Sequence, residues 1–286
     1  MAFVTYRGEP ALTADDRLAA DALGTLGVRT EPRCWDDPDV DWLAYDAIVL
    51  RSTWDYHLRA REFRGWIDRL DAIGARIWNR SPVLRWNMDK RYLADLADGP
   101  LTPPPTEIVP RGSALTLTAF LEARGWTEAV MKPGVSADAF ATERTSSATA
   151  AADQPRIDAM LAQSDVVIQP FVRDIRESGE LSLMFFGGTF SHAVRKRPRP
   201  GEFRVQERFG GTHSAAAASP ALVAASGQLL ARVAPGCLYA RVDIVETSER
   251  PMLMELELVE PSLFLEHHEP AAMTFARVIT HASRPG

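Results

Sequence analysis

Residues 254–264, MELELVEPSLF, place acidic side chains inside an otherwise apolar run. The alternation of Glu and Leu is typical of a strand, although a strand with one face in water would alternate in the same way. Upstream lie YARVDIV (residues 239–245), the polar segment ETSER and Pro251. A strand, a polar turn and a second strand in this order predict a β-hairpin.

The register of this hairpin follows from where it turns. A turn centred near Glu249 places Asp243 opposite Glu255 and Arg241 opposite Glu257, because the two numbers of each pair have a constant sum, and all four side chains then share one face. Three carboxylates with a single arginine among them would repel one another unless a positive charge lies between them. A divalent cation is the simplest candidate, so Asp243, Glu255 and Glu257 are predicted metal ligands.

Composition narrows the class of protein. With 286 residues, 46% hydrophobic and 24% charged, the chain fits a soluble globular protein of about two domains. A net charge of -6 disfavours binding to nucleic acid or to an anionic membrane and favours small-molecule partners. Cys34 and Cys237 form no CxxC motif, and the N-terminus lacks a signal-peptide pattern, so we expect a cytoplasmic protein without disulfides.

The first part of the chain alternates strand and helix patterns. AFVTY, DAIVLRSTW and ARIW are expected strands, and residues 13–26 and REFRGWIDRLDAIG are expected helices, which predicts a Rossmann-like parallel sheet. Ligands of such sheets bind beyond the carboxyl ends of the strands. Arg51 and Ser52, in RSTWDY, are therefore candidate substrate contacts; the alternative is a surface turn with an ordinary ion pair.

The rest of the chain is expected to be mixed. A proline-rich connector at residues 99–110 marks a boundary, and strands that resemble hairpins dominate residues 180–257. The other expected elements are a helix at 87–98 that contains Lys90, a helix at 118–125, a strand, loop and strand over 128–142, an alanine-rich helix ending at 163, a strand at 165–172 and a helix at 220–233 capped by Ser219.

Lys132 ends the apolar run AVMK and is followed by Pro133 and Gly134. A lysine at the end of a core strand, beside a loop, can reach phosphate oxygens. Alone, it could equally be a strand-end lysine whose stem packs on the core while its charge stays in water.

The order of AVMKPG, VVIQPFV, GELS and the acidic hairpin resembles the ATP-grasp superfamily, in particular bacterial glutathione synthetase, over residues 45–265. The resemblance implies an α/β protein with the ATP-grasp fold. It implies an N-terminal Rossmann-like domain at 1–86, an α+β lid subdomain with its connector at 87–172, and a central domain with an antiparallel sheet at 173–286.

The same resemblance assigns nucleotide contacts. Lys90 and Lys132 would hold the phosphates, and Glu180 would hold the ribose hydroxyls. The linker QPFV would read the adenine edge through Gln169, Pro170, Phe171 and Val172. GVSADAF departs from the family, whose phosphate lid normally has several glycines at this place.

Substrate contacts are assigned in the same way. RKRPRPGEFRVQERFGG is similar to the family's substrate loop, which implies roles for Arg204, Arg197 and Gly211. ARVD is similar to the Arg-x-Asp of D-alanine:D-alanine ligase, in which the arginine steadies an acyl phosphate, so Arg241 and Arg204 are the expected catalytic residues. Glu257 stands where the family usually has asparagine, which keeps an oxygen ligand and adds a charge.

The activity implied by the resemblance is that of an ATP-dependent ligase. It would activate a small, amino acid-like carboxylate as an acyl phosphate for attack by an amine, using ATP and Mg²⁺, with Mn²⁺ as an alternative ion. Relatives are often dimers or tetramers, which leaves room for a homo-oligomer. Two alternatives stay open: an intramolecular cyclo-ligase that closes a ring of the D-cycloserine type, and a nucleotide-binding module without ligase activity.

The histidines give no metal motif. His267 and His268 are adjacent and would point to different faces, and neither has a histidine partner four residues away, so a zinc site is not expected. His57 and His213 lie near the expected substrate segments. They would act there as acids, bases or hydrogen-bond donors; the alternative is that they are solvated loop residues.

Overall fold

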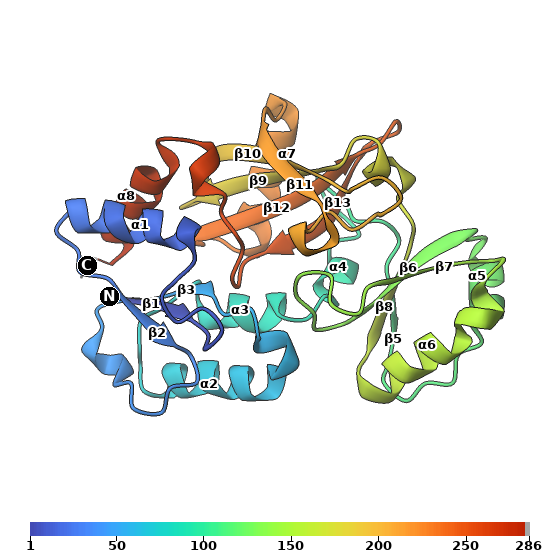
Figure 1. The fold of residues 1–286 in the computed structure, drawn as a ribbon, viewed down its shortest axis with the longest axis horizontal. Helices are drawn as coiled ribbons and strands as arrows, with labels where there is room; N and C mark the ends of the chain where they lie inside the picture. The colour runs from blue at the N-terminus through green and yellow to red at the C-terminus, as the bar shows by residue number, and fades with distance from the viewer. Residues whose placement is uncertain (284–286) are drawn as a thin grey trace.

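The computed structural model describes residues 1–283 and contains three β-sheets with helices packed on them (Figure 1). The first sheet has the strand order β2-β1-β3-β4, the second β5-β8-β6-β7 and the third β11-β10-β9-β12-β13. The expected ATP-grasp arrangement, with a parallel N-terminal sheet, an α+β lid and an antiparallel central sheet, is therefore present. The expected domain limits at 86/87 and 172/173 remain a prediction, and residues 284–286 of the third domain lie outside the described residues.

The N-terminal sheet is parallel throughout, as the alternation of strands and helices predicts. Thr13 caps the first helix by accepting a hydrogen bond from the amide of Asp16. One strand, the half-exposed edge segment EPRC, was not predicted because it carries no apolar alternation. The elements are β1 (Ala2–Thr5), α1 (Ala14–Thr25), β2 (Glu31–Cys34), β3 (Ile48–Ser52), α2 (Ala60–Ala72) and β4 (Ile77–Trp78).

The second sheet forms the small body at the right of Figure 1. All its pairs are antiparallel, and its core is filled by side chains such as Met131, Ile157 and Ile168. The strand expected before residue 142 begins only at Glu143, so the preceding loop is longer than predicted. The elements are β5 (Glu107–Val109), α5 (Leu117–Arg124), β6 (Glu128–Pro133), β7 (Glu143–Ser146), α6 (Ala150–Gln163) and β8 (Val166–Pro170).

The prediction of a single helix over residues 87–98 is wrong. The chain instead forms α3 (Ser81–Asn87) and α4 (Tyr92–Asp95), and Lys90 lies in the turn between them. The amide of Lys90 donates to the carbonyl of Gly134 at 2.7 Å. This tertiary hydrogen bond uses an amide that a continuous helix would need for itself.

The central sheet contains the acidic hairpin in the predicted register. β12 (Tyr239–Glu246) pairs with β13 (Pro251–Glu257) so that Arg241 lies opposite Glu257 and Asp243 opposite Glu255; the register shifts only beyond Asp243. Helix α7 (Pro220–Val233) begins and ends as predicted, with Ser219 as its cap. The other strands are β9 (Glu180–Phe186), β10 (Thr189–Arg197) and β11 (Thr212–Ala216).

The outer edge of β13 is covered by α3, α4 and the connector. The side-chain amide of Asn87 donates to the carbonyl of Leu256 at 2.7 Å and accepts from the amide of Leu258 at 2.7 Å. The hydroxyl of Tyr92 accepts from the amide of Leu256, and the carbonyl of Thr102 accepts from the amide of Leu253. The hairpin is thereby fixed on both sides, by β9 and by these groups.

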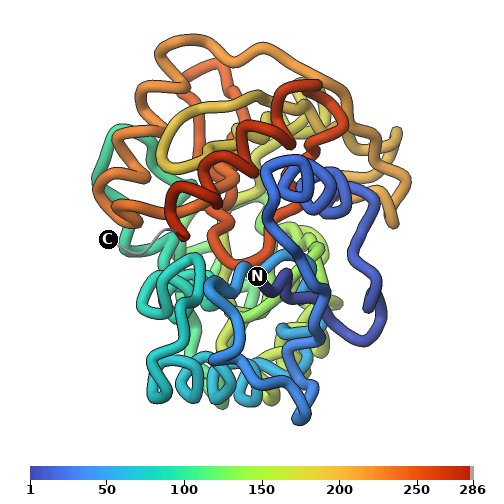
Figure 2. Tube along the Cα trace, turned by 90° about the vertical axis from the view of Figure 1, so that its left-hand side faces the viewer, coloured from blue at the N-terminus to red at the C-terminus, as the bar shows by residue number. Residues whose placement is uncertain are grey.

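Helix α8 (Ala271–Ala282), which was not predicted, packs beside α1 (Figure 2). Its buried Phe275 stacks on Phe186 of the central sheet, with ring centroids 4.8 Å apart. Segment 258–268 leads from β13 to α8 along the same face, and His192 on β10 lies within hydrogen-bonding distance of its carbonyls at Leu263 and Phe264. Among residues 1–283, no helix is long and apolar enough to cross a membrane.

Candidate active site

One face of the central sheet carries a chain of alternating charges. The strand pairing places Lys196 opposite Glu180 and Asp243 opposite Ser182. The ammonium group of Lys196 lies 2.5 Å from a carboxylate oxygen of Glu180 and 3.0 Å from one of Asp243. Asp243 also accepts from Arg241 at 3.0 Å and from the hydroxyl of Ser182 at 2.6 Å.

The chain of charges continues onto the second strand of the hairpin. The guanidinium of Arg241 also pairs with Glu257. Glu255 pairs with Lys90, whose Nζ lies 2.5 Å from Oε1 of Glu255 and 2.7 Å from the carbonyl oxygen of Ser136. The predicted metal ligands therefore share one face with Lys90 and Arg241.

The charge argument from the sequence was incomplete, because the protein supplies cations of its own between the acids. Burial opposes ionisation of Asp243, but Arg241 and Lys196 outweigh it and lower the pKa of Asp243. Lys196 was missed because it stands in a basic run, RKRPRP, whose pairing with Glu180 the sequence does not show. Within residues 1–283, the oxygens of Asp243, Glu255 and Glu257 do not gather into one cluster of ligand atoms.

The cluster still has room for added positive charge. Burial, with Glu255 and Asp243 nearby, raises the pKa of Glu257 to about 8 despite Arg241. Burial also raises the pKa of Glu260 to about 7. Carboxylate oxygens are hard donors that suit Mg²⁺ or Mn²⁺, and such an ion would displace the protons that the raised pKa values retain, so the donor set fits such an ion. The acids of the cluster are Glu180, Asp243, Glu255, Glu257 and Glu260, against the bases Lys90, Lys132, Lys196 and Arg241.

A cavity between the second sheet and the central sheet brings the expected nucleotide contacts together. Burial lowers the pKa of Lys132 to about 8, and Lys132 has no ion-pair partner among residues 1–283. A lysine with an unpaired ammonium group in a cavity is suited to bind an anion. Among the predicted residues, the cavity is lined by Lys90, Lys132, Gln169, Pro170, Phe171, Val172, Glu180, Arg204 and Glu255.

The expected adenine segment forms an aromatic part of this cavity. Phe171 meets Phe203 edge to face, with centroids 5.7 Å apart, and the guanidinium groups of Arg144 and Arg176 lie 5.3 and 5.1 Å from its ring centroid. Glu180 differs from the expectation, because it is engaged by Lys196 rather than free, and burial raises its pKa to about 7.

Loop 134–142, the expected lid, reaches three other parts of the chain. Its Ser136 carbonyl accepts from Lys90, its Asp138 pairs with Arg208 at 2.7 Å, and its Phe140 ring lies 5.0 Å from that of His57. In place of glycines, Asp138, Ala139 and Ala141 adopt positive φ values of 50°, 52° and 49°. Such conformations persist in residues other than glycine where surrounding contacts hold them.

Arg204 and Arg197, the two arginines expected to contact substrate, differ in their surroundings. Arg204 binds the carboxylate of Glu202 at 2.7 Å and lies 3.7 Å above the ring of Phe209, and this arginine holds the pKa of Glu202 at about 2. Arg197 is exposed at the end of β10. A Cβ atom at Gly211 would lie 2.0 Å from the carbonyl oxygen of Val205, so this tight approach requires glycine.

Arg51 and Ser52 do not form a substrate rim. Arg51 is 1% exposed; it pairs with Asp16 at 2.8 Å and donates to the carbonyl of Pro261 at 2.9 Å. Ser52 is fully buried, and its hydroxyl lies 3.1 Å from that of Thr5. Both residues connect parts of the fold: Arg51 joins β3 to α1 and to segment 258–268, and Ser52 joins β3 to β1.

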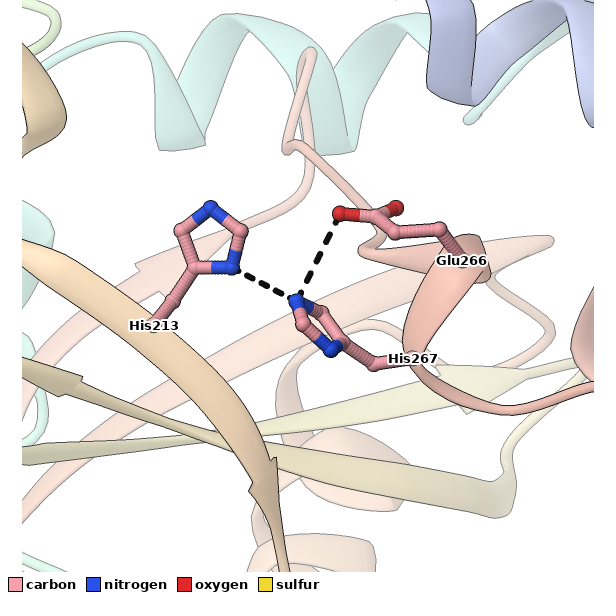
Figure 3. Close-up of side chains that lie close together, drawn as sticks. All are labelled: His213, Glu266 and His267. Atoms are coloured by element: carbon pink, nitrogen blue, oxygen red, sulfur yellow. Dashed lines mark hydrogen bonds and ion pairs between the residues drawn. The ribbon is translucent and has the colours of Figure 1, made fainter.

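A group of histidines lies at the β11 side of the central sheet. His213 Nδ1 lies 2.6 Å from His267 Nε2, and Glu266 Oε1 lies 3.5 Å from the same His267 nitrogen (Figure 3). The second nitrogen of His213, Nε2, lies 2.5 Å from Glu207 Oε1. No sequence pattern marks this group, because His213 and His267 come from different elements.

The chain is similar to known proteins along nearly its whole length. The family described as the N-terminal domain of D-cycloserine synthetase DcsG matches residues 1–79. The cycloserine biosynthesis protein DcsG of Streptomyces lavendulae is 33% identical over an alignment of 279 residues, and the match covers 93% of this chain and 92% of that protein.

Solved structures agree in fold. A crystal structure of D-cycloserine synthetase DcsG superposes with a TM-score of 0.88 at 32% identity, covering 99% of both chains. D-alanine–D-alanine ligase from Bacillus anthracis superposes with a TM-score of 0.69 at 14% identity, covering 99% of this chain and 96% of that one. A RimK-domain ATP-grasp protein from Sphaerobacter thermophilus gives 0.70 at 18% identity, covering 98% and 100%.

Proposed function

This chain belongs to the D-cycloserine synthetase DcsG family of ATP-grasp ligases, and on that premise we propose that it closes a ring within one amino acid-like substrate. As a member of this family, it is an ATP-dependent carboxylate–amine ligase. The alternative of a nucleotide-binding module without activity is therefore set aside. Of the two enzymatic alternatives, the named activity of the 33% identical relative favours cyclisation.

The cavity supports the position of ATP. Gln169 to Val172 would face the base, and Lys90 and Lys132 would face the phosphates, because these residues line one cavity and Lys132 brings an unpaired charge. Glu180 would reach the ribose only after exchanging Lys196 for the hydroxyls. Loop 134–142, held at Ser136 and Asp138, would exclude water from the phosphates.

The first chemical step needs no side-chain base, because the attacking group is already a carboxylate. A carboxylate oxygen of the substrate attacks the γ-phosphorus of ATP, the bond to ADP breaks, and an acyl phosphate forms. Lys90 and Lys132 hold the phosphate oxygens during this transfer. Mg²⁺, held by Asp243, Glu255 and Glu257, would neutralise phosphate charge, and Mn²⁺ could take the same ligands.

In the second step the nitrogen of the same molecule attacks the acyl carbon, and phosphate leaves. A tetrahedral oxyanion develops, and Arg241, a buried cation on the central sheet, would stabilise it. Arg204 would assist after release from Glu202. The observation that carries this proposal is the placement of Arg241, Lys90 and the three acids on one face beside one cavity.

A substrate panel tests the proposal. Amino acids with a second nitrogen on their side chain, amine or aminooxy, are supplied singly and in pairs with ATP and Mg²⁺, and phosphate release and product mass are measured. Phosphate release and a cyclic product from a single compound are expected. Release that requires two compounds would overturn ring closure and leave an intermolecular ligase.

A further inference from the structure

His213 and His267 each turn one ring nitrogen toward the same point beside Glu266. His213 lies on β11 opposite Lys196, and His267 lies in the short 3-10 helix η5 (Leu265–His267), yet their ring nitrogens are 2.6 Å apart. Glu266 contributes a carboxylate oxygen, and the ligand atoms of the three residues all lie within 4.8 Å of one another (Figure 3). No other group of three or more His, Cys, Asp or Glu residues in the described part of the chain is gathered in this way.

Glu207 fixes the chemistry of His213. Its carboxylate lies 2.5 Å from His213 Nε2, so that nitrogen carries the proton and donates it. The lone pair of His213 is then at Nδ1, which points at His267 and Glu266 (Figure 3). A histidine that binds a metal through one nitrogen and donates its other N–H to a carboxylate is the usual arrangement at metal centres.

The surroundings of the three residues are rich in acids. Glu207 and Glu266 lie next to the imidazoles, and Asp15 lies beside Glu266. Unlike the acids near Arg241, Glu207 and Glu266 have imidazoles and no lysine or arginine as ion-pair partners in the described part of the chain, and an added cation would relieve the repulsion among these carboxylates.

We propose that His213, His267 and Glu266 form a site for a borderline-soft divalent metal of the Zn²⁺ class, separate from the Mg²⁺ ligands. Two imidazoles and one carboxylate are a ligand set that zinc takes with a fourth position left to water. Bonds of about 2.0–2.1 Å in tetrahedral geometry need the two nitrogens about 3.3 Å apart, so they must separate by less than about 1 Å. The inference does not depend on ring closure or on ATP.

The site would join two segments that flank the catalytic face. β11 follows the substrate loop that contains Arg204 and Gly211, and η5 follows the end of β13. Phe264 lies between them, with its ring centroid 5.0 Å from that of His213 and 5.7 Å from the guanidinium carbon of Arg241. A bound metal would thus hold the substrate loop against the segment that covers Arg241.

Metal titration of the full chain tests the proposal. After chelator treatment, Co²⁺ is added in the absence of ATP and with excess Mg²⁺ to occupy the oxygen site, and visible absorption bands of nitrogen-ligated cobalt are recorded. One equivalent of Co²⁺ is expected to bind, with displacement by Zn²⁺. Zn²⁺ is also expected to raise the melting temperature.

Variants separate this site from weaker binding elsewhere. His213→Gln and His267→Gln should each weaken binding at least about a hundredfold, and Glu207→Gln about tenfold, because the last alters only the partner of a ligand. His268→Gln is the matched control, since His268 is adjacent and exposed but stacks on His192. Absence of cobalt bands, equal binding by His213→Gln, or an equal loss in His268→Gln would overturn the proposal; melting in chelator shows that each variant is folded.

Discussion

The hairpin β12–β13 and loop 134–142 both border the proposed nucleotide cavity, but they are held in place by different means. The hairpin is fixed by backbone ladders on one side and by side chains of α3 and α4 on the other, and its acids have cations at 2.5–3.0 Å. The loop has no ladder of its own. It is held by hydrogen bonds from Lys90 to two of its carbonyls, by Arg208 on Asp138 and by His57 against Phe140, and it contains three non-glycine residues at positive φ.

This difference separates preorganised parts from movable ones. Charges fixed in a dry, paired network need little rearrangement when a transition state forms, which favours chemistry on the hairpin. A loop without a backbone ladder opens at lower cost than the hairpin, which favours admission of nucleotide. Substitutions in the hairpin should therefore lower turnover, and substitutions in the loop should chiefly alter binding.

The largest effect is expected for Glu255→Gln. Loss of this charge removes a proposed Mg²⁺ ligand, so kcat should fall about a thousandfold in a phosphate-release assay. Because Lys90 loses its partner, the free energy of unfolding should also fall, by about 1–3 kcal/mol. Glu249→Gln, at the exposed turn of the same hairpin, is the control; similar turnover of both variants would remove Glu255 from the role.

Arg241→Ala comes next. Removal of one positive contact to a developing oxyanion typically costs about 3 kcal/mol, so kcat should fall about a hundredfold while KM for ATP changes little. Arg241→Lys should recover part of the activity. Arg195→Ala is the control, because Arg195 lies on the opposite face of the sheet and pairs with Glu246. This variant should leave kcat near that of the unmodified chain.

Lys132 is expected to make the affinity for ATP depend on pH. Its pKa in the free protein is about 8, lowered from the ordinary 10.5 by burial, and phosphate binding favours the charged form. Below pH 8 most of the charge is already present, whereas above pH 8 binding must take up a proton, so ATP affinity should fall about fivefold between pH 8 and pH 9.

Calorimetric titration in two buffers with different heats of ionisation measures this uptake. Lys132→Arg stays charged and should abolish it. An unchanged pH slope in Lys132→Arg would assign the proton to another group.

The smallest effect is expected in the loop. Asp138→Asn tolerates a positive φ and removes only the ion pair with Arg208, so KM for ATP should rise about 2–5-fold with kcat preserved. Arg208→Gln should do the same, and the double variant should be no worse than either single one. A fall in kcat larger than the rise in KM would contradict the contrast between loop and hairpin.

Features determined by local pattern were predictable from the sequence. The register of Asp243 with Glu255 follows from strand alternation and one polar turn, and α7 follows from Ser219-Pro220. The roles assigned to individual residues remain proposals, whereas the family membership of the chain follows from its relatives.

Features that depend on distant contacts were not predictable. Lys196 reaches Asp243 only because β10 pairs with β9, and Lys90 leaves the helix only because its amide binds Gly134. Arg51 was misassigned because its partner Asp16 lies 35 positions away, on α1. His213 and His267 lie 54 positions apart in the sequence, and no periodic pattern predicts their contact.

The covered edge of β13 has a further consequence. Exposed strand edges invite pairing with other chains and can seed aggregation. Here Asn87, Tyr92 and Thr102 occupy the hydrogen-bonding groups along the outer side of the strand that bears Glu255 and Glu257. Any self-association of this protein must therefore use a surface other than this strand, and crowding during synthesis should leave the acidic pair in register.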